Sequence, residues 1–506
     1  MTPPRITLLL ATALLAFGCT DPTEPLASIA RPAAVASARN DVLPGRYLVV
    51  FRGEQVPPDF NATVAALGGT VDNSLDDIGV ATVSGLTAEG ALSLAGQDGV
   101  KSVEPRMTGS FNEDSDVAAD DDGAAAVTPA LALRDALAAP TGDLRSPTMA
   151  LHYSWQWNLL AIHADEAWAA DGTGWDKARV AIIDTGIDYL HPELAGLVDM
   201  DASVSFSDDD AATAAMYPGR ELFTDRFWHG TANASLVASV GRELAGVNQQ
   251  ATLIAVKVTN GAAPLPLDDG LPAIYWSVKH RADVMSFGGG VRFNRTELPA
   301  LYEAYVRAFE YAWRKGALSV APAGDAGRNR DLDLAAGLVG MPCDAPHVMC
   351  ASLTAPTAAQ SISGPWTNVD ALQPTNNYGS DITVAAPGGS RFTNTRIWLV
   401  CTTSPSTGTS PTDIDNPTSP TACQPGATFT GYAQGVGTSW SSATVAGLAA
   451  MLVSRYGHNH PDLIRQRIID SADDLGAPGW DPFYGWGRVN AARAMDVANR
   501  RGRNDS

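Results

Sequence analysis

Three side chains in this sequence have types that together suit nucleophilic catalysis. Asp184 ends an apolar run and precedes Thr-Gly, His229 opens the segment His-Gly-Thr, and Ser439 ends the segment Gly-Thr-Ser. A serine hydroxyl is a weak nucleophile near neutral pH, so it needs an imidazole to accept its proton and a carboxylate to orient that imidazole. The three segments supply one group of each kind.

Each segment alone also has an ordinary structural interpretation. Asp-Thr-Gly forms turns, a lone histidine is usually structural or exposed, and Gly-Thr-Ser is a common loop tripeptide. Their conjunction is far less common. We therefore interpret them as a triad for acyl transfer, in which Ser439 attacks, His229 acts as base and then as acid, and Asp184 orients the imidazole.

The elements that must position these residues follow an α/β pattern. Short apolar runs typical of strands in a buried parallel sheet occupy residues 179–184, 252–258, 282–286 and 317–321. Residues 268–280 and 298–315 have apolar side chains at helical spacing, and residues 440–455 are apolar enough for a buried central helix. In open α/β sheets, sites form at the carboxyl ends of the strands.

A smaller module precedes this region. Residues 43–106 alternate between strand and helix patterns in the order βαββαβ, which predicts a small α+β module. Residues 107–154 are rich in Ala, Asp, Pro and Thr and predict an acidic linker, with a calcium loop or a processing site as alternatives. The remaining boundaries are a flexible tether at 20–42, a larger domain at 155–497 and a polar tail at 498–506.

The first 19 residues have the outline of a signal peptide. Arg5 precedes the apolar residues 6–17, and no later stretch reaches about 18 uninterrupted apolar residues. The run Leu15-Ala-Phe-Gly-Cys19 resembles a bacterial lipobox, although Ala16 stands where an aliphatic residue is usual. We expect an exported protein, extracellular or in the cell envelope, lipidated at Cys19; the alternative is an ordinary signal peptide.

The cysteines predict disulfide bonds, and the net charge excludes one class of function. Besides Cys19, the sequence contains Cys343, Cys350, Cys401 and Cys423, an even number that favours disulfides in an exported protein. Sequence proximity suggests Cys343 with Cys350 and Cys401 with Cys423, out of three connectivities. The net charge of −21 argues against nucleic-acid binding, because phosphate binding needs clustered Lys and Arg.

Over residues 155 to about 497 the chain resembles the subtilisin-like serine peptidases, or subtilases. The matching segments are Val180-Ala-Ile-Ile-Asp-Thr-Gly-Ile-Asp188, His229-Gly-Thr231, Ser286-Phe-Gly-Gly289, Asn377-Tyr-Gly379, Val384-Ala-Ala-Pro-Gly388 and Gly437-Thr-Ser439. The chain order Asp, His, Ser is that of subtilisin. The resemblance implies a three-layer α/β fold with a mainly parallel central sheet, preceded by a ferredoxin-like α+β pro-domain.

The resemblance also implies partners and binding residues. The pro-domain would chaperone folding, be cut off autocatalytically and then act as an intramolecular inhibitor. Extended polypeptide substrates would pair with Ser286, Phe287, Gly288 and Gly289, with Ala323 and Gly324 as the opposite wall of the S1 pocket. We expect a monomer that requires no cofactor. Structural calcium is common in the family, but no segment here fixes its ligands, so the metal residues are unknown.

One position departs from the family pattern. The residue that normally stabilises the oxyanion is an Asn after Gly, whereas this chain has Asp325 after Gly324. Losing one such donor typically raises the barrier by about 2.7 to 4 kcal/mol. Because burial and neighbouring negative charge raise the pKa of a carboxyl group, we hypothesise a protonated Asp325 and better activity at mildly acidic pH. The alternative is that Ser439 N–H and other groups hold the oxyanion.

Four other functions fit the sequence less well. A catalytically impaired homologue that only binds peptides is the main rival, because Asp325 weakens one function while the cleft would remain. An aspartic peptidase would need a second Asp-Thr-Gly or Asp-Ser-Gly, and an α/β-hydrolase needs Gly-x-Ser-x-Gly. A metalloenzyme lacks its motif, since no His-Glu-x-x-His occurs in the sequence.

Overall fold

The computed structural model describes residues 41–109, 146–171, 177–261, 265–393, 395–400 and 432–496. The signal peptide with Cys19, most of the tether and of the acidic linker, the polar tail, and both Cys401 and Cys423 lie outside the described residues. A disulfide joins Cys343 and Cys350, which confirms the first of the two expected pairings.

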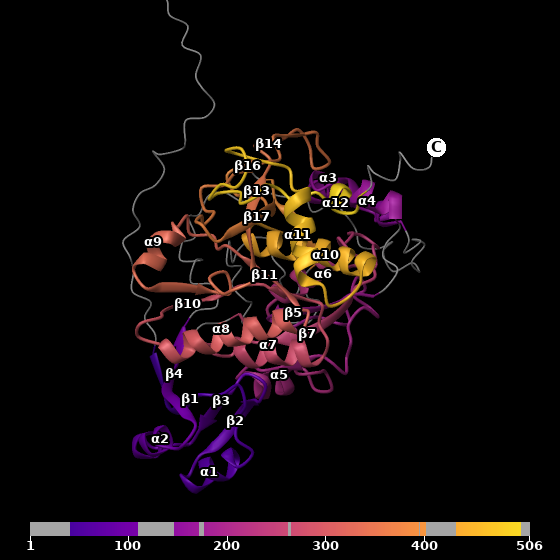
Figure 1. Ribbon diagram of the computed structural model, residues 1–506. Coiled ribbons are helices and arrows are strands. Elements are labelled where there is room, and N and C mark those ends of the chain that lie inside the picture. Colours follow the sequence, from indigo (N-terminus) through magenta and orange to yellow (C-terminus); the bar gives the residue numbers. More distant parts are fainter. Residues whose placement is uncertain are drawn as a thin grey trace, which may run out of the picture. The chain divides into compact units, whose positions relative to one another are not determined.

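The N-terminal module has the expected βαββαβ order. It consists of β1 (Asp41–Phe51), α1 (Phe60–Ala66), β2 (Thr70–Leu75), β3 (Val80–Ser84), α2 (Ala88–Ala95) and β4 (Val100–Gly109), drawn in indigo to purple in Figure 1. The strands are antiparallel in the order β2-β3-β1-β4. The two helices cover one face, where Phe51, Phe60, Val64 and Leu94 form a separate apolar core.

Strand β4 runs three residues past the expected end of the module at residue 106. Thr108 and Gly109 pair in antiparallel register with Pro266 and Leu265 of β8 (Leu265–Pro266). These ladder hydrogen bonds extend the strand, and β8 becomes the fifth strand of the module's sheet. The edge strand β4 of the module's sheet therefore pairs with a strand that the larger domain contributes.

The larger domain is built on an eight-stranded sheet whose main path has the order β16-β13-β11-β9-β5-β7-β6, with β17 beside β13. Its strands are β5 (Arg179–Asp184), β6 (Val204–Ser205), β7 (Thr252–Lys257), β9 (Val284–Phe287), β11 (Leu318–Pro322), β13 (Met349–Ala355), β16 (Ala371–Leu372) and β17 (Ile382–Pro387). All pairs are parallel except β13 with β16. The mainly parallel sheet is confirmed, as are the four strands expected from apolar runs.

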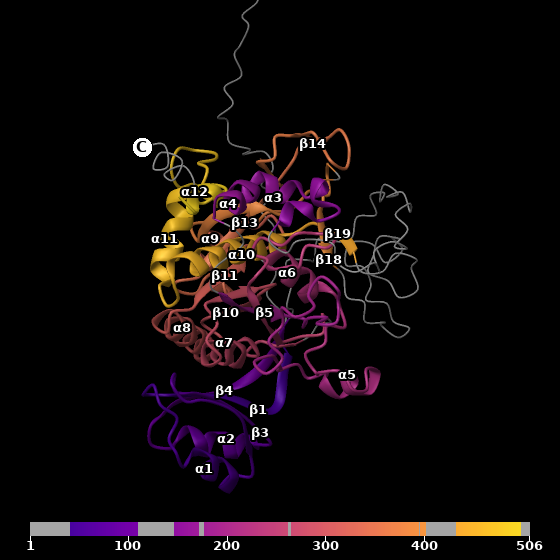
Figure 2. The ribbon, with the colours of Figure 1, turned by 90° about the vertical axis from the view of Figure 1, so that its right-hand side faces the viewer.

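Helices cover both faces of this sheet (Figures 1 and 2). Along β5, Val180 and Ile182 pack into a cluster with α6 (His229–Val237) and α10 (Thr438–Tyr456). Ala181 and Ile183 face the opposite cluster, with α7 (Gly270–Lys279) and α8 (Pro299–Arg314). Because alternate side chains of a strand point to opposite faces, this split gives three layers and explains the continuous apolar runs.

The remaining described elements lie around this framework. They are η2 (Pro147–Met149), η3 (Tyr153–Trp155), α3 (Trp157–Ala161), α4 (Ala164–Asp171), α5 (Asp210–Met216), β10 (Val291–Asn294), α9 (Arg330–Ala335), β12 (Leu338–Met341), β14 (Ala358–Ala359), β15 (Trp366–Thr367), β18 (Ile397–Val400), β19 (Tyr432–Gly435), α11 (Pro461–Ser471) and α12 (Ala491–Ala494). Within the described ranges, every helix is too short or too polar to cross a membrane.

The contact between α10 and the chain around α6 depends on Gly447. A Cβ atom at this position would lie 2.7 Å from Val247 Cβ and 3.3 Å from Val237 Cα. Such distances are shorter than van der Waals contact, so only glycine lets the two segments approach this closely.

We predict that Gly447→Ala destabilises the protein, although alanine is the better helix former. The gain in helix propensity is about 1 kcal/mol, whereas overpacking a core costs about 1 to 3 kcal/mol. Urea unfolding should show a net loss in the free energy of unfolding. The control is Gly90→Ala in α2, where a Cβ atom would lie 3.4 Å from its nearest neighbours and should stabilise. Stabilisation at both positions would contradict the packing argument.

Candidate active site

Asp184 is a fully buried carboxylate at the carboxyl end of β5. It accepts hydrogen bonds from Thr185 N–H at 2.6 Å and from Asn233 Nδ2 at 2.7 Å. His229 Nδ1 lies 2.9 Å from both of its oxygens. These contacts give both oxygens of the buried carboxylate hydrogen-bond partners, and they fix the carboxylate relative to the imidazole.

The His229 ring is held by the turn that precedes α6. Trp228 has a φ of 126°, a conformation that costs a non-glycine residue about 1 to 3 kcal/mol. The buried Asp225 carboxylate compensates, because it accepts hydrogen bonds from the N–H groups of Phe227 and Trp228, each at 2.9 Å, and from that of Thr231 at 2.9 Å. Asp225 thereby sets the direction in which α6 starts.

The electrostatics around His229 favour the charged imidazolium. Burial by itself lowers the pKa of His229, but the charge of Asp184 and its hydrogen bond raise it, and Asp225 and Asp325 add to this effect. The net pKa of His229 is raised above its usual value. Since Nδ1 contacts Asp184, Nε2 is the nitrogen left to exchange protons with a neighbouring group.

Ser439 lies in the first turn of α10 and is largely buried. Its hydroxyl donates a hydrogen bond to the Gly288 carbonyl at 2.7 Å, and within the described ranges no hydrogen bond joins it to the His229 ring. The next residue, Trp440, has its ring centroid 4.9 Å from that of His229. The structure thus brings the three predicted residues together, with the serine hydroxyl turned to Gly288. A hydrogen bond between a catalytic serine and its histidine often forms only when substrate is present.

The two predicted substrate-binding segments lie at the same edge of the sheet as Asp184. Ser286 and Phe287 end β9, and Gly288 follows, with its N–H donating to Ile183 O at 3.2 Å. A Cβ atom at Gly288 would fall 1.7 Å from Asp184 Oδ2, so only glycine fits beside the carboxylate. Ala323 and Gly324 directly follow the parallel neighbour β11.

Asp325 contacts the first turn of α10. Thr438 N–H donates to Oδ1 of Asp325 at 3.0 Å, and the Thr438 hydroxyl donates to Oδ2 at 3.0 Å while accepting from Gly324 N–H at 3.0 Å. The helix terminus thus supplies hydrogen-bond donors to Asp325 that sequence inspection could not locate. The protonated Asp325 hypothesised from the sequence stays a prediction.

Sequence reasoning missed two residues that organise the site. Asp225 stands four positions before His229, and Asn233 stands four positions after it, on the same face of α6. The helical spacing of Asn233 was a usable signal, but Asp225 carries no motif of its own. Its role depends on the curvature of the turn, which the sequence pattern does not specify.

Few side chains that could bind a metal ion lie close together in the part of the chain that the structure describes. The one group of three metal-ligating side chains found there is Cys343, Cys350 and Asp381, and both sulfurs are already joined in the disulfide. It lies apart from the three triad residues in sequence and belongs to a different set of elements.

Comparisons with known proteins agree with this architecture. The model of the subtilase family matches residues 176–487. A thermophilic serine proteinase from Bacillus sp. (strain AK1) is 27% identical over 355 residues, 69% of each chain. Thermitase from Thermoactinomyces vulgaris is 28% identical over 344 residues, 67% of this chain and 95% of thermitase.

Among solved structures, the epidermin leader peptide processing serine protease from Staphylococcus aureus is similar in fold. The TM-score is 0.63 at 19% identity, over 91% of this chain and 99% of that one. The family match spans the parallel sheet, both substrate-binding segments and all three predicted triad positions. Because that match covers more than half of its residues, the chain belongs to the subtilase family of serine-type endopeptidases.

Proposed function

We propose that this protein hydrolyses peptide bonds with Asp184, His229 and Ser439 as its catalytic triad. The observation that carries the proposal is the buried Asp184–His229 pair next to the first turn of α10, where Ser439 lies. Strands β9 and β11 end beside this pair, and a polypeptide substrate would pair with the residues at these two strand ends.

The proposed reaction is acyl transfer. Ser439 Oγ attacks the substrate carbonyl carbon while His229 Nε2 takes the hydroxyl proton, and Asp184 stabilises the resulting imidazolium. His229 then gives this proton to the leaving amine as the peptide C–N bond breaks. Water attacks the acyl-enzyme, its proton passes through His229, and Ser439 is regenerated. All reacting groups are side chains or water, so the proposed chemistry requires no cofactor; a structural calcium ion would serve stability.

The oxyanion would be held mainly by the Ser439 backbone N–H. This group lies at the start of the 19-residue helix α10, where the first N–H groups point away from the helix and the dipole favours negative charge. Asp325 occupies the position of the usual asparagine, and in its charged form it would oppose the developing charge. The enzyme would therefore work with one donor fewer than most subtilases.

We further propose that the N-terminal module is an inhibitory pro-domain. The Glu104 carboxylate accepts hydrogen bonds from Ala300 N–H at 3.0 Å and Leu301 N–H at 3.1 Å, at the start of α8. The Arg106 guanidinium donates to Asp268 and Asp269 just before α7, at 2.9 and 3.0 Å. Together with the pairing of β4 and β8, these contacts support a module that binds as an added strand.

We also propose that the protein is exported from the cytoplasm. The N-terminal sequence and the disulfide between Cys343 and Cys350 support a protein that works in an oxidising compartment, outside the cell or in the cell envelope. Lipidation of Cys19 would hold it at a membrane surface, and the protein would act as a monomer.

Ser439→Ala should abolish both casein hydrolysis and removal of the module. We expect at least about a thousandfold loss of hydrolysis, because the nucleophile is gone. The matched control is Ser441→Ala, a buried serine of the same helix whose hydroxyl donates to Ala386 O. N-terminal sequencing and hydrolysis across pH 5 to 9 are the measurements. An uncut, inactive wild type at every pH would favour a protein that only binds peptides.

Asp325→Asn should raise kcat by at least about 10-fold, because it replaces a repelling carboxylate with a donor. It should also shift the acidic limb of the pH–rate profile to lower pH. The sign follows from His229: its pKa is raised by Asp184, Asp225 and Asp325, activity needs the neutral base, and removing one negative charge lowers that pKa.

The control for this experiment is Asp331→Asn, which makes the same charge change at a carboxylate that contacts Ser380. It should leave kcat and the acidic limb unaltered. A wild-type rate and profile in Asp325→Asn would refute the idea that this carboxylate opposes the oxyanion.

Arg106→Gln should weaken inhibition by the module. The change leaves Asp268 and Asp269 buried without their cation, which costs about 3 to 5 kcal/mol when a buried pair is broken. The inhibition constant of separately produced module, residues 41–109, against the processed enzyme should rise by at least about 100-fold. Arg52→Gln, at an exposed arginine of the same module, is the control and should change it little. Equal inhibition by both variants would disprove the assigned contact.

A further inference from the structure

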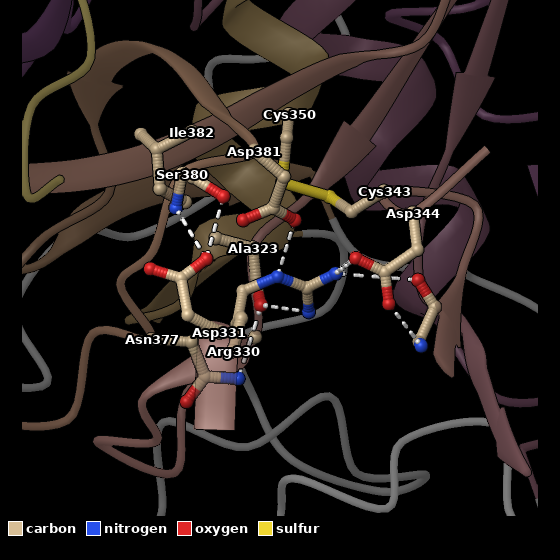
Figure 3. Close-up of polar contacts among 12 residues, drawn as sticks. Ala323, Arg330, Asp331, Cys343, Asp344, Cys350, Asn377, Ser380, Asp381 and Ile382 are labelled. Atoms are coloured by element: carbon tan, nitrogen blue, oxygen red, sulfur yellow. Dashed lines mark hydrogen bonds and ion pairs between the residues drawn. A yellow bond between two sulfur atoms is a disulfide. The ribbon is translucent and has the colours of Figure 1, made fainter. Parts of the chain in front are cut away.

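The segment that joins β11 to Asp325 is fixed at one carbonyl group. Ala323 O accepts hydrogen bonds from Arg330 Nη1 at 3.2 Å and from Asn377 Nδ2 at 3.0 Å (Figure 3). The N–H of Ala323 donates to Ala351 O at 2.9 Å, in the neighbouring strand β13. Both peptide groups of this residue are therefore held by partners from other segments of the chain.

The next residues form a turn that only this arrangement allows. Gly324 has a φ of 100°, which a residue with a Cβ atom rarely adopts. Its carbonyl accepts from Asn377 N–H at 3.0 Å, and its N–H donates to the Thr438 hydroxyl. The orientation of Asp325 against the first turn of α10 thus depends on the peptide plane between Ala323 and Gly324.

Arg330 is itself held in one orientation by two carboxylates. Its Nε donates to Asp381 at 2.5 Å, and its Nη2 donates to Asp344 at 3.1 Å and to Gly340 O at 3.3 Å. Its side chain is 10% exposed. A guanidinium buried to this degree needs paired charges, and its planar fork lets one residue bind two carboxylates and two carbonyls at once.

The disulfide ties this cluster to the sheet. Cys343 directly precedes Asp344, and Cys350 lies in β13 opposite Ala321 of β11. Cys343 Sγ is 3.2 Å from Pro322 O, next to the carbonyl that Arg330 holds. Figure 3 shows the disulfide beside Asp381 and Asp344. Asp344 is thereby tied to β13, while Asp381 directly precedes β17.

We propose that Arg330 is a positioning residue for the proposed peptidase. It contacts the predicted substrate wall at the Ala323 carbonyl, and by fixing that carbonyl it holds the turn at Gly324 and Asp325 against Thr438. This inference rests on the proposed function, because the turn matters for the rate only if Ser439 is the nucleophile. Arg330 then acts through backbone geometry. It holds the Ala323–Gly324 wall and, through Thr438, the first turn of α10 that presents Ser439, and these positions favour the reaction although the charge of Asp325 opposes the oxyanion.

The test compares Arg330→Lys with Arg488→Lys in the full-length protein. Lysine keeps the positive charge but has a single ammonium, which cannot bind both carboxylates and the carbonyl together. Arg488 is the matched control: it is also buried, with Nη1 on Asp370 at 2.5 Å and Nη2 on Asp473 at 2.6 Å, and it has no contact with the Ala323 turn.

We expect Arg330→Lys to lower kcat by about 10- to 100-fold with KM changed less than about threefold, since displaced catalytic geometry acts on the transition state. Arg488→Lys should lose comparable thermal stability and keep its kcat. If both variants lose kcat equally, Arg330 is merely structural and the proposal is wrong. Should Arg330→Lys fail to fold, Asp381→Asn removes the carboxylate at Nε and should lower kcat in the same direction.

Hydrogen exchange gives a second measurement that does not depend on activity. The amides of Gly324 and Ala326 donate to Thr438 and Asn377, and they should exchange about 10-fold faster in Arg330→Lys than in Arg488→Lys. Equal exchange overturns the proposal whether or not the wild type is active. An inactive wild type with faster exchange in Arg330→Lys would instead reject the proposed function and leave the positioning of the turn established.

Discussion

The site depends on holding the buried Asp184 carboxylate in one orientation inside the protein. A buried carboxylate is unfavourable unless its oxygens are hydrogen-bonded, and here Thr185 N–H, Asn233 Nδ2 and the His229 ring share that task. Their positions require the end of β5, the start of α6 and a glycine at 288, because no side chain fits beside Oδ2. The strained backbone at Trp228 and the hydrogen bonds of Asp225 serve the same arrangement, because they bring His229 to this carboxylate.

The same negative environment has opposite effects on the two charges of the proposed reaction. Asp184, Asp225 and Asp325 raise the pKa of His229 and so favour the imidazolium that forms when Ser439 gives up its proton. The oxyanion forms nearby and is disfavoured by the same charges. The start of α10 is the compensating element, because the dipole of this helix presents positive potential at Ser439. Asp325 itself uses that potential through Thr438, which reduces what remains for substrate.

The sequence was sufficient for the features that follow from local patterns. Apolar runs predicted four strands of the parallel sheet, helical spacing predicted α7, α8 and α10, and proximity predicted the disulfide between Cys343 and Cys350, all confirmed. The triad roles stay predictions, although the three side chains do lie together. What could not be predicted are contacts set by tertiary structure: the extension of β4 through β8, the donors that Thr438 offers to Asp325, and the pairing of Arg330 with Asp344 and Asp381.

The module and the site use the backbone in related ways, which connects inhibition to catalysis. Strand β4 pairs with β8 by main-chain hydrogen bonds, and the proposed substrate would pair with the segment after β9 by the same kind of bond. Main-chain pairing provides affinity with little dependence on side chains. Selectivity for the module must therefore come from charged groups outside the ladder, namely Glu104 at the start of α8 and Arg106 between Asp268 and Asp269. A substrate without these groups would bind less tightly than the module, which is what the proposed inhibitory role requires.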